Sequence, residues 1–256
     1  MSNILILQPT AIAAIAVSRG TGGANLLTPD PKEVWTDSAV GSAATIDIDL
    51  GSVQTIDTIA LISVIPPVAG TTWSITGGSA SYTTSVIRAS TALRAVDATG
   101  QAQLRSHALH FGATWNVRYI RVTVTQPAGL AVLSIGVSII GKAFVPVFNN
   151  EWGAGRRVID TGTSTALAGG GFANVEGVRK GSYAFTLGDL SNDEVDALYA
   201  IQLAVGETSP LLIVEDPAVT AGQYHRIHYG QLRSLRAFDR RSPGRTRWEL
   251  TIDQWV

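Results

Sequence analysis

Hydrophobic and polar residues alternate through much of the first 142 residues, and this pattern predicts β-strands. The alternation is strict in residues 45–50, where Ile46, Ile48 and Leu50 share one face. Clusters of Gly, Pro and Ser separate such runs at short intervals, and no long stretch keeps the helical period. The pattern therefore indicates a β-sandwich or jelly roll. The expected strands cover residues 3–8, 13–18, 45–50, 55–63, 73–76, 81–88, 117–125 and 133–140.

One segment in the second part of the chain carries the signals of an α-helix. Ser191 is followed three residues later by Glu194, which is the arrangement of a capping box at a helix start. Apolar residues then recur at helical spacing, and Gly206 ends the pattern. These signals predict a helix over residues 191–205. Its mainly apolar stripe consists of Val195, Leu198, Ile201, Gln202 and Val205.

The change of pattern after Lys142 predicts two domains, residues 1–142 and residues 143–256. We expect a mainly β protein: an N-terminal β-sandwich of the jelly-roll type, followed by a β-barrel or sandwich domain with one packed α-helix. The Gly- and Thr-rich residues 161–171 are expected to form a flexible loop. Strands of the second domain are expected at residues 181–187, 211–215, 223–229, 231–238 and 246–255.

The composition excludes several classes of function. The 256 residues include no Cys, which excludes disulfide frameworks, thiolate metal sites and cysteine nucleophiles. The 19 Lys and Arg residues nearly balance the 20 Asp and Glu residues, so we expect no direct nucleic-acid binding through counterion release. Only 15% of the residues are charged, which fits a subunit covered by neighbours, because interface cores are poor in Lys, Glu and Asp.

The most apolar N-terminal stretch covers residues 4–17 and is interrupted by Gln8, Pro9 and Thr10. It is too short to span a bilayer. No Lys or Arg precedes Arg19, although a secretory signal begins with a basic segment. We therefore expect a chain that is made without processing and has no membrane span.

Three segments of the first domain occur in the order found in discoidin-like domains. Residues 30–37 (DPKEVWTD) form an acidic loop with a Trp near its end, and residues 46–51 (IDIDLG) contain a hydrophobic-Asp-Leu-Gly strand. Residues 117–122 (VRYIRV) contain an Arg-Tyr-hydrophobic-Arg strand. Over residues 10–142 the chain therefore resembles the discoidin-like, or galactose-binding-like, jelly rolls.

A sugar site would need an aromatic face for the ring and a few charged or amide groups on loops at one end of the sandwich. Trp115, in an expected loop over residues 112–116, and Asp37 are the best-placed candidates for carbohydrate binding. Trp35 and Trp73 are expected in the core, whereas Trp115 fits a core position and a binding position equally well.

No metal site, cofactor or catalytic residue is expected. Discoidin-like domains often carry Asp-Gly where this chain has Thr28 and Pro29, and the loss of this carboxylate disfavours calcium. Two His-x-x-His pairs begin at His107 and His225, but a spacing of three places the side chains on opposite faces of a strand. The chain contains no phosphate loop, nucleophile elbow or suggestive triad, so the sequence predicts that the protein is not an enzyme.

Residues 233–247 contain the only basic cluster of the chain, with a hairpin turn expected at residues 242–244. No aromatic residues alternate with these arginines to stack nucleic-acid bases. We expect them to contact another subunit of an oligomer or to pair within the chain. They are Arg233, Arg236, Arg240, Arg241, Arg245 and Arg247.

The second domain resembles the tail-tube-like fold of phage tail proteins in its order of a strand, a capped helix and further strands. The resemblance covers residues 145–256 and includes the segments at residues 183–187 (YAFTL), 210–217 (PLLIVEDP) and 247–252 (RWELTI). It implies a module that assembles into rings, and it rests on layout rather than on any catalytic signature.

The two resemblances together lead to the hypothesis of a structural component of a phage tail tip, a distal tail or minor tail protein. Such a protein is made in the host cytoplasm and located in the virion, and it forms a homo-oligomeric ring, a trimer or a hexamer. Its expected partners are the tube and hub proteins and a host cell-surface glycan, which the jelly roll would bind unless it only decorates the tail. The alternative is a stand-alone carbohydrate-binding, lectin-like module.

Overall fold

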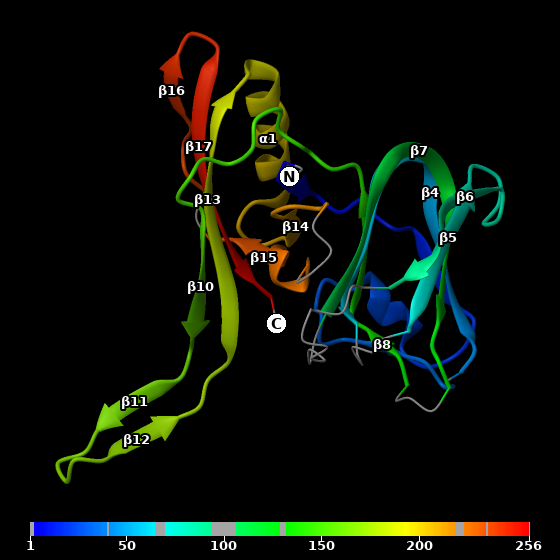
Figure 1. The fold of residues 1–256 in the computed structure, drawn as a ribbon, viewed down its shortest axis with the longest axis horizontal. Helices are drawn as coiled ribbons and strands as arrows, with labels where there is room; N and C mark the ends of the chain where they lie inside the picture. The colour runs from blue at the N-terminus through cyan, green and yellow to red at the C-terminus, as the bar shows by residue number, and fades with distance from the viewer. Residues whose placement is uncertain are drawn as a thin grey trace. The chain divides into compact units, whose positions relative to one another are not determined.

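A computed structural model gives the fold of the chain (Figure 1). The chain is mainly β and contains one α-helix in the part that the structure describes, as the sequence predicts. It divides into two compact units. The jelly-roll unit comprises Met1–Pro146 and Leu211–Ile227, and the helical unit comprises Val147–Pro210 and His228–Val256. The structure describes residues 3–39, 41–64, 70–93, 106–128, 132–218, 223–233 and 235–255.

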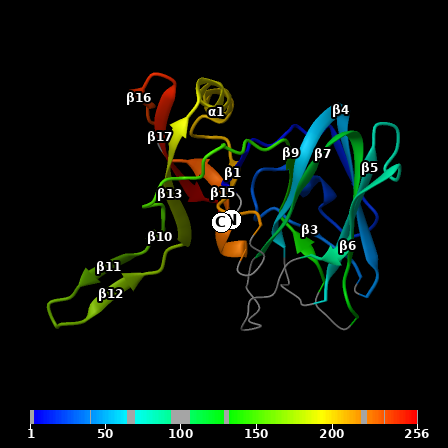
Figure 2. The same cartoon turned by 45° about the horizontal axis from the view of Figure 1, so that its top comes forward.

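Two long antiparallel strands organise the jelly-roll unit. β4 (Ala43–Val64) pairs with β7 (Ser106–Thr125) over both halves of its length, and the two run side by side in Figures 1 and 2. Register shifts interrupt the pairing, and such irregularities bend a strand pair. β5 pairs with the second half of β7 and β9 with the second half of β4, so the bent pair contributes to both layers of a sandwich. The sheet order is β2 (Ala14–Val17), β4, β7, β5 (Thr72–Gly78) and β6 (Ser85–Ala92), with β9 (Val137–Gly141) on β4.

The alternation seen in the sequence separates core from surface in this unit. Ile46 and Ile48 are completely buried, whereas Asp47, between them, lies on the opposite face. Trp35 and Trp73 are buried, as predicted, and each such side chain contributes about 1.5–3 kcal/mol of hydrophobic stabilisation or more. The core therefore follows from the period-two pattern and from large aromatic side chains.

The first strand, β1 (Leu5–Leu7), does not join its sequence neighbour β2. It pairs antiparallel with β14 (Leu211–Val214), and the backbone of Ile6 exchanges two hydrogen bonds with Phe144. Every residue of β1 and β14 is buried, which explains their uninterrupted apolar sequences. The short strands β3 (Trp35–Thr36) and β8 (Ser134–Ile135) also pair, and η1 (Gly23–Leu27) is a 3-10 helix.

The helical unit contains a sheet in which β13 (Arg179–Leu190) lies between β10 (Gly155–Asp160) and β17 (Arg245–Gln254). β15 (Ile227–Leu232) and β16 (Asp239–Ser242) both pair with β17, and the predicted turn over residues 242–244 is confirmed.

Two predicted strands in this region are wrong in part. The strand expected at residues 223–229 begins with a 3-10 helix, η2 (Gln223–Arg226), before β15 starts. The strand expected at residues 231–238 ends at Leu232, and the next strand starts only at Asp239.

The predicted helix is present as α1 (Asn192–Val205), and the capping box is complete. The Ser191 hydroxyl accepts a hydrogen bond from the Glu194 amide at 3.3 Å, and Glu194 Oε2 accepts one from the Ser191 amide at 2.8 Å. Gly206 follows the helix with a positive φ of 56°. The helix packs on β17, where the Tyr199 ring centroid lies 6.5 Å from that of Trp248.

Residues 161–171 do not form the flexible loop predicted from their composition. β11 (Thr163–Ala166) pairs with β12 (Phe172–Val175) in a two-stranded ribbon beyond the end of the β10–β13 pair, as Figures 1 and 2 show. Every residue of both strands is exposed, so no core marks the ribbon in the sequence. The high β-propensity of Thr is the local signal that favours these strands.

Candidate functional site

Charged side chains line the outer face of the jelly-roll sheet, opposite to the core. Asp47 lies directly across from Arg121 in the register of β4 and β7. The guanidinium of Arg121 donates to both carboxylate oxygens of Asp47, at 2.6 Å each. Arg118 donates in the same way to Asp49, at 2.8 and 3.0 Å. Paired strands therefore hold two bidentate ion pairs on this surface.

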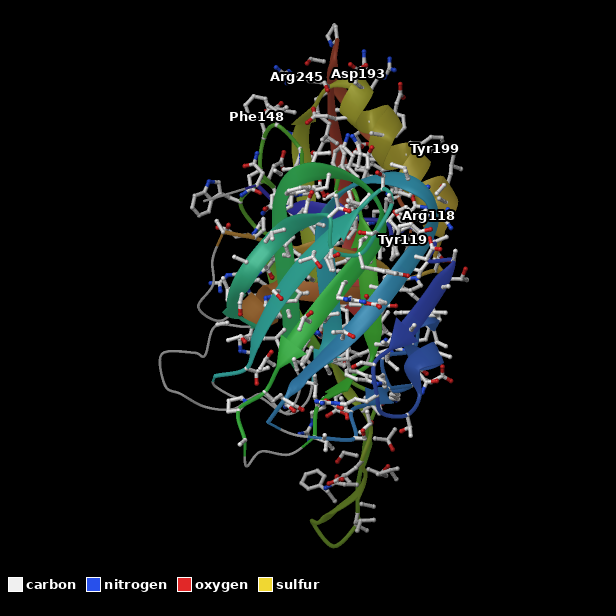
Figure 3. The ribbon with its side chains drawn as sticks, turned by 90° about the vertical axis from the view of Figure 1, so that its right-hand side faces the viewer. Arg118, Tyr119, Phe148, Asp193, Tyr199 and Arg245 are labelled. Atoms are coloured by element: carbon white, nitrogen blue, oxygen red, sulfur yellow. The ribbon has the colours of Figure 1, made fainter. Side chains whose placement is uncertain are left out.

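Two tyrosines complete this surface. The rings of Tyr82 and Tyr119 meet edge to face, with centroids 5.1 Å apart and an interplanar angle of 63°. The guanidinium carbon of Arg118 lies 4.8 Å from the Tyr119 centroid, and that of Arg121 lies 5.5 Å from the Tyr82 centroid. Figure 3 shows Arg118 and Tyr119 next to each other on β7. The tyrosine–arginine face comprises Asp47, Asp49, Tyr82, Arg118, Tyr119 and Arg121.

The ion pairs set the protonation states of this face. The hydrogen bonds from Arg118 and from the amide of Gly51 hold the pKa of Asp49 below its ordinary value. Burial, together with the negative charges of Asp47 and Asp49, raises the pKa of Tyr82. At neutral pH Asp49 therefore carries its negative charge beside Arg118, and Tyr82 keeps its phenolic proton.

Small residues border the face. Ala14 and Ala16 of β2 pair with the two carboxylate positions of β4, and Gly78 of β5 pairs with Tyr119. A surface of aromatic rings, hydroxyl groups and charges suits a polar ring-shaped ligand, because C–H groups pack on aromatic faces and hydroxyls bond to the charged groups. Each carboxylate already accepts two hydrogen bonds from an arginine, which is a poor arrangement for a general base.

Asp37, the first residue predicted for sugar binding, is buried and occupied. It is only 4% exposed, and Arg19 donates to its two oxygens at 2.6 and 2.8 Å. Burial acts to raise the pKa of Asp37, but the hydrogen bonds from Arg19 and from the Ala39 amide outweigh it, so the pKa lies below its ordinary value. Arg19 also contacts β3, because the indole N–H of Trp35 donates to the Arg19 carbonyl at 3.0 Å.

Trp115, the second predicted residue, lies in a strand and not in the expected loop. It belongs to β7, where it pairs with Ile56 next to a register shift. Its side chain is half-buried and packs against the core. The neighbouring Asn116 accepts a hydrogen bond from Thr55 at 2.7 Å. Trp115 and Asp37 therefore have different neighbours, and a carbohydrate role for either stays a prediction.

Several of the six clustered arginines pair within the chain, which is one of the two alternatives left open by the sequence. Arg236 forms an ion pair with Glu249 at 2.5 Å, and Arg247 forms one with Glu151 at 3.0 Å. Arg241 approaches the same Glu151 carboxylate at 3.6 Å. Pairs of this kind at the protein surface contribute little stability individually, at about 0–1 kcal/mol each.

Arg245 contacts backbone and aromatic groups instead. It donates to the Asp189 carbonyl at 2.9 Å, and its guanidinium carbon lies 5.5 Å from the Phe148 ring centroid. Figure 3 shows Phe148 and Arg245 close together. Arg233 and Arg240 are exposed, and their role in an oligomer interface stays a prediction.

The histidines occupy separate environments. The Nδ1 atom of His107 accepts a hydrogen bond from the Ser63 amide, whereas His110 is buried. His228 is also buried, and its ring stacks on Tyr183 at 4.8 Å. Among the residues that the structure describes, no group of three or more His, Asp or Glu side chains could hold a metal ion.

Sequence reasoning missed the tyrosine–arginine face, although it used the segment around Arg118 and Tyr119 to find the fold. The alternation in residues 45–50 places Asp47 and Asp49 on the face opposite to Ile46, Ile48 and Leu50, and by itself this is typical of a solvated strand face. The signal that could have found the site is the pairing of two strands with opposite charges on their outer faces.

No protein-family model and no curated protein sequence matches the chain. Within the described residues, no helix is long and apolar enough to cross a membrane.

Several solved structures are similar to about half of the chain. The CBM32 of AlyQ in complex with 4,5-unsaturated mannuronic acid is 21% identical over 52% of this chain and 98% of that chain, with a TM-score of 0.38. Chitosan-binding module 1 from a chitosanase/glucanase of Paenibacillus sp. IK-5 is 14% identical over 52% and 98%, with a TM-score of 0.40. CpGH89CBM32-6 of Clostridium perfringens is 15% identical over 53% and 99%, with a TM-score of 0.39.

Proposed function

We propose that the jelly-roll unit is a non-catalytic module that binds carbohydrate through the tyrosine–arginine face. The observation that carries this proposal is the Tyr82–Tyr119 pair, which contacts two bidentate arginine–aspartate pairs. Five of the six residues lie on strands, and only Tyr82 lies in a turn. Because the groups are already held in place, binding would cost little conformational entropy.

The charged groups can still bond to a ligand although they bond to each other. Each carboxylate oxygen has two lone pairs, and Asp49 Oδ1 uses both, for Arg118 and for the Gly51 amide. The other oxygen of Asp49 and both oxygens of Asp47 each use one lone pair for an arginine, so each can accept a second hydrogen bond from a sugar hydroxyl. The side chains of Arg118 and Arg121 keep 37% and 33% of their surface exposed. The face therefore offers acceptors, donors and aromatic surface within one small area.

The test is a glycan array followed by calorimetry with the full chain. Tyr119→Ala is expected to weaken binding of any glycan found by about tenfold or more. The variant removes the aromatic ring on which the sugar would pack and, with it, the contacts of that ring with Tyr82 and Arg118. Tyr199→Ala is the matched control, since Tyr199 is an exposed tyrosine of the helical unit and should leave binding unchanged.

Trp115→Ala separates the two candidate surfaces. If it abolishes binding while Tyr119→Ala does not, the site lies at Trp115 and the tyrosine–arginine face is structural. If no glycan binds the wild-type chain, the proposed function is wrong.

A second candidate function is assembly, as the structural subunit of a phage tail tip in the virion. The observation that favours it is the number of large apolar side chains exposed on the helical unit, including Trp152, Val158 and Phe172. Exposed apolar groups of this kind mark surfaces that contact a partner. In this hypothesis the helical unit builds a homo-oligomeric ring and contacts the tube and hub proteins.

Native mass spectrometry tests the assembly hypothesis. A closed trimer or hexamer is expected, and Phe172→Ser should shift it toward the monomer while Tyr119→Ala should not. A chain that stays monomeric at high concentration and is absent from phage particles would contradict the hypothesis.

A further inference from the structure

Three side chains of the jelly-roll unit form a cluster away from the tyrosine–arginine face. The guanidinium carbon of Arg88, on β6, lies 5.1 Å from the ring centroid of Trp73, on β5. Arg88 Nη1 lies 3.4 Å from Nδ1 of His110, on β7, and Arg88 Nε donates to Thr91 at 2.8 Å. We call Trp73, Arg88 and His110 the Arg88 cluster.

The charge of Arg88 is not matched by a carboxylate. Arg19, Arg118 and Arg121 of the same unit each donate to both oxygens of an aspartate. In the described ranges, no Asp or Glu lies within ion-pair distance of Arg88. The side chain is half-buried, and burial lowers the pKa of Arg88. A partly desolvated cation of this kind favours an anion beside it.

The ring N–H groups of His110 and Trp73 are hydrogen-bond donors that have no acceptor in the cluster. Arginine can only donate, so Nδ1 of His110 must be the acceptor in their contact, and the proton of the neutral ring is then on Nε2. Burial and the charge of Arg88 lower the pKa of His110 to about 4, so the ring is neutral at pH 7.

Two of these donors are deeply buried. His110 is 8% exposed and its Nε2 has no hydrogen-bond partner, and Trp73 is 1% exposed and its Nε1 has none. Unpaired polar atoms in the interior are uncommon and costly, and they call for an explanation.

Gly112 lies next to the Cε1–Nε2 edge of the His110 ring. It is exposed, and a Cβ placed on it would lie 3.2 Å from Cε1 and 3.4 Å from Nε2 of His110. No side chain of residue 112 covers this edge, but Nε2 itself is closed off from solvent, so a ligand reaches it only if neighbouring side chains move.

We propose that the Arg88 cluster binds a carboxylate group, supplied either by a small free acid or by an acidic sugar. The planar guanidinium of Arg88 matches a carboxylate, and the two buried ring N–H groups become further donors for its oxygens when neighbouring side chains move aside. Asp57 acts electrostatically on His110 but is not in contact with the cluster: its Oδ1 accepts hydrogen bonds from Thr58 and Ala143, and no hydrogen bond or ion pair of the described residues joins it to Arg88 or His110. This site is separate from the tyrosine–arginine face and does not depend on the proposed carbohydrate function.

The experiment is an NMR titration of the 15N-labelled full chain with acetate, glucuronate and glucose. Both acids are expected to shift the Arg88 Nε–H and Trp73 indole N–H signals, and glucose is not. Tighter binding of glucuronate than of acetate identifies an acidic sugar as the source, whereas equal binding identifies a small free acid. If neither acid shifts these signals at millimolar concentration, the proposal is wrong.

Arg88→Gln is expected to weaken acid binding about 10- to 100-fold, which is the range for losing hydrogen bonds to a charged group. Arg179→Gln is the matched control, because Arg179 is exposed and pairs with Asp160 at 3.1 Å. An equal loss of acid binding in Arg88→Gln and Arg179→Gln would show that the acids are attracted by the overall charge and not by the Arg88 cluster, and this would overturn the proposal.

A second variant tests the same site if Arg88→Gln does not fold. Gly112→Ala keeps the charge and narrows the approach to His110, so it should weaken binding while the amide spectrum stays folded; unchanged affinity would place the ligand elsewhere. Tyr119→Ala should leave acid binding intact, so failure of this site and failure of the carbohydrate proposal can be told apart.

Discussion

The two units of the chain place their large apolar side chains differently. In the jelly-roll unit, Trp35 and Trp73 are buried, and most charges of the outer face are paired. In the helical unit, Trp152 is fully exposed, and Val158 and Phe172 are 72% and 68% exposed. The jelly roll is therefore stabilised by its own core, whereas much apolar surface of the helical unit is available to a partner.

The largest expected effect is on the free energy of unfolding, when one tryptophan in each unit is replaced by alanine. Trp35→Ala removes a completely buried indole and its hydrogen bond to Arg19, and it should lower the free energy of unfolding by about 3–5 kcal/mol. Trp152→Ala should change it by less than about 0.5 kcal/mol. Urea unfolding followed by circular dichroism measures both.

The pair of variants tests the comparison directly. Similar losses in Trp35→Ala and Trp152→Ala would mean that Trp152 is covered in solution, for example in a stable oligomer. Repeating the measurement at several protein concentrations separates that case, because only oligomeric stability depends on concentration.

The next largest effect is a pH dependence of the stability, caused by the buried His110 of the jelly-roll unit. The pKa of His110 is lowered from 6.5 to about 4 in the folded chain, so between these values the unfolded chain binds a proton that the folded chain does not. Stability should therefore be lost as the pH falls from 6.5 toward 4, by about 3 kcal/mol at most. The pKa values of Asp37 and Asp49 are lowered, so their contributions are lost only at more acidic pH.

His110→Gln should flatten this pH dependence, because it removes the group whose pKa differs between the folded and the unfolded chain. Thermal unfolding between pH 7 and pH 4.5 measures the slope. A wild-type slope equal to that of His110→Gln would show that His110 titrates normally in the folded chain.

Local signals in the sequence were enough to predict the main elements. The alternation around Ile46 and Ile48 predicted a core strand, and the Ser191–Glu194 box predicted α1. The β11–β12 ribbon could not be found in this way, since all its residues are exposed and no periodic burial marks it. The pairing of β1 with β14 joins segments about 200 residues apart, which no local pattern specifies.

The candidate site was less predictable than the fold. Its position in an acidic segment makes Asp37 a candidate in the sequence, but in the fold it is buried and Arg19, 18 positions earlier, donates to both of its oxygens. Tyr82 and Tyr119 come together through the pairing of β5 with β7, so their contact depends on register. Register, burial and ion pairing across strands are properties of the folded chain, and they decide which polar residues remain available.

The smallest effect concerns the start of α1 in the helical unit. Ser191→Ala removes the side-chain oxygen that accepts from the Glu194 amide, and it should cost about 1 kcal/mol. Glu194→Ala should cost at least as much, because Glu194 also accepts hydrogen bonds from the Ser191 and Val147 amides. Asp196→Ala is the control, since Asp196 is an exposed residue of the same helix outside the box, and it should change stability by less than about 0.5 kcal/mol. If all three variants unfold alike, the cap contributes little and the helix is held by its packing on β17 alone.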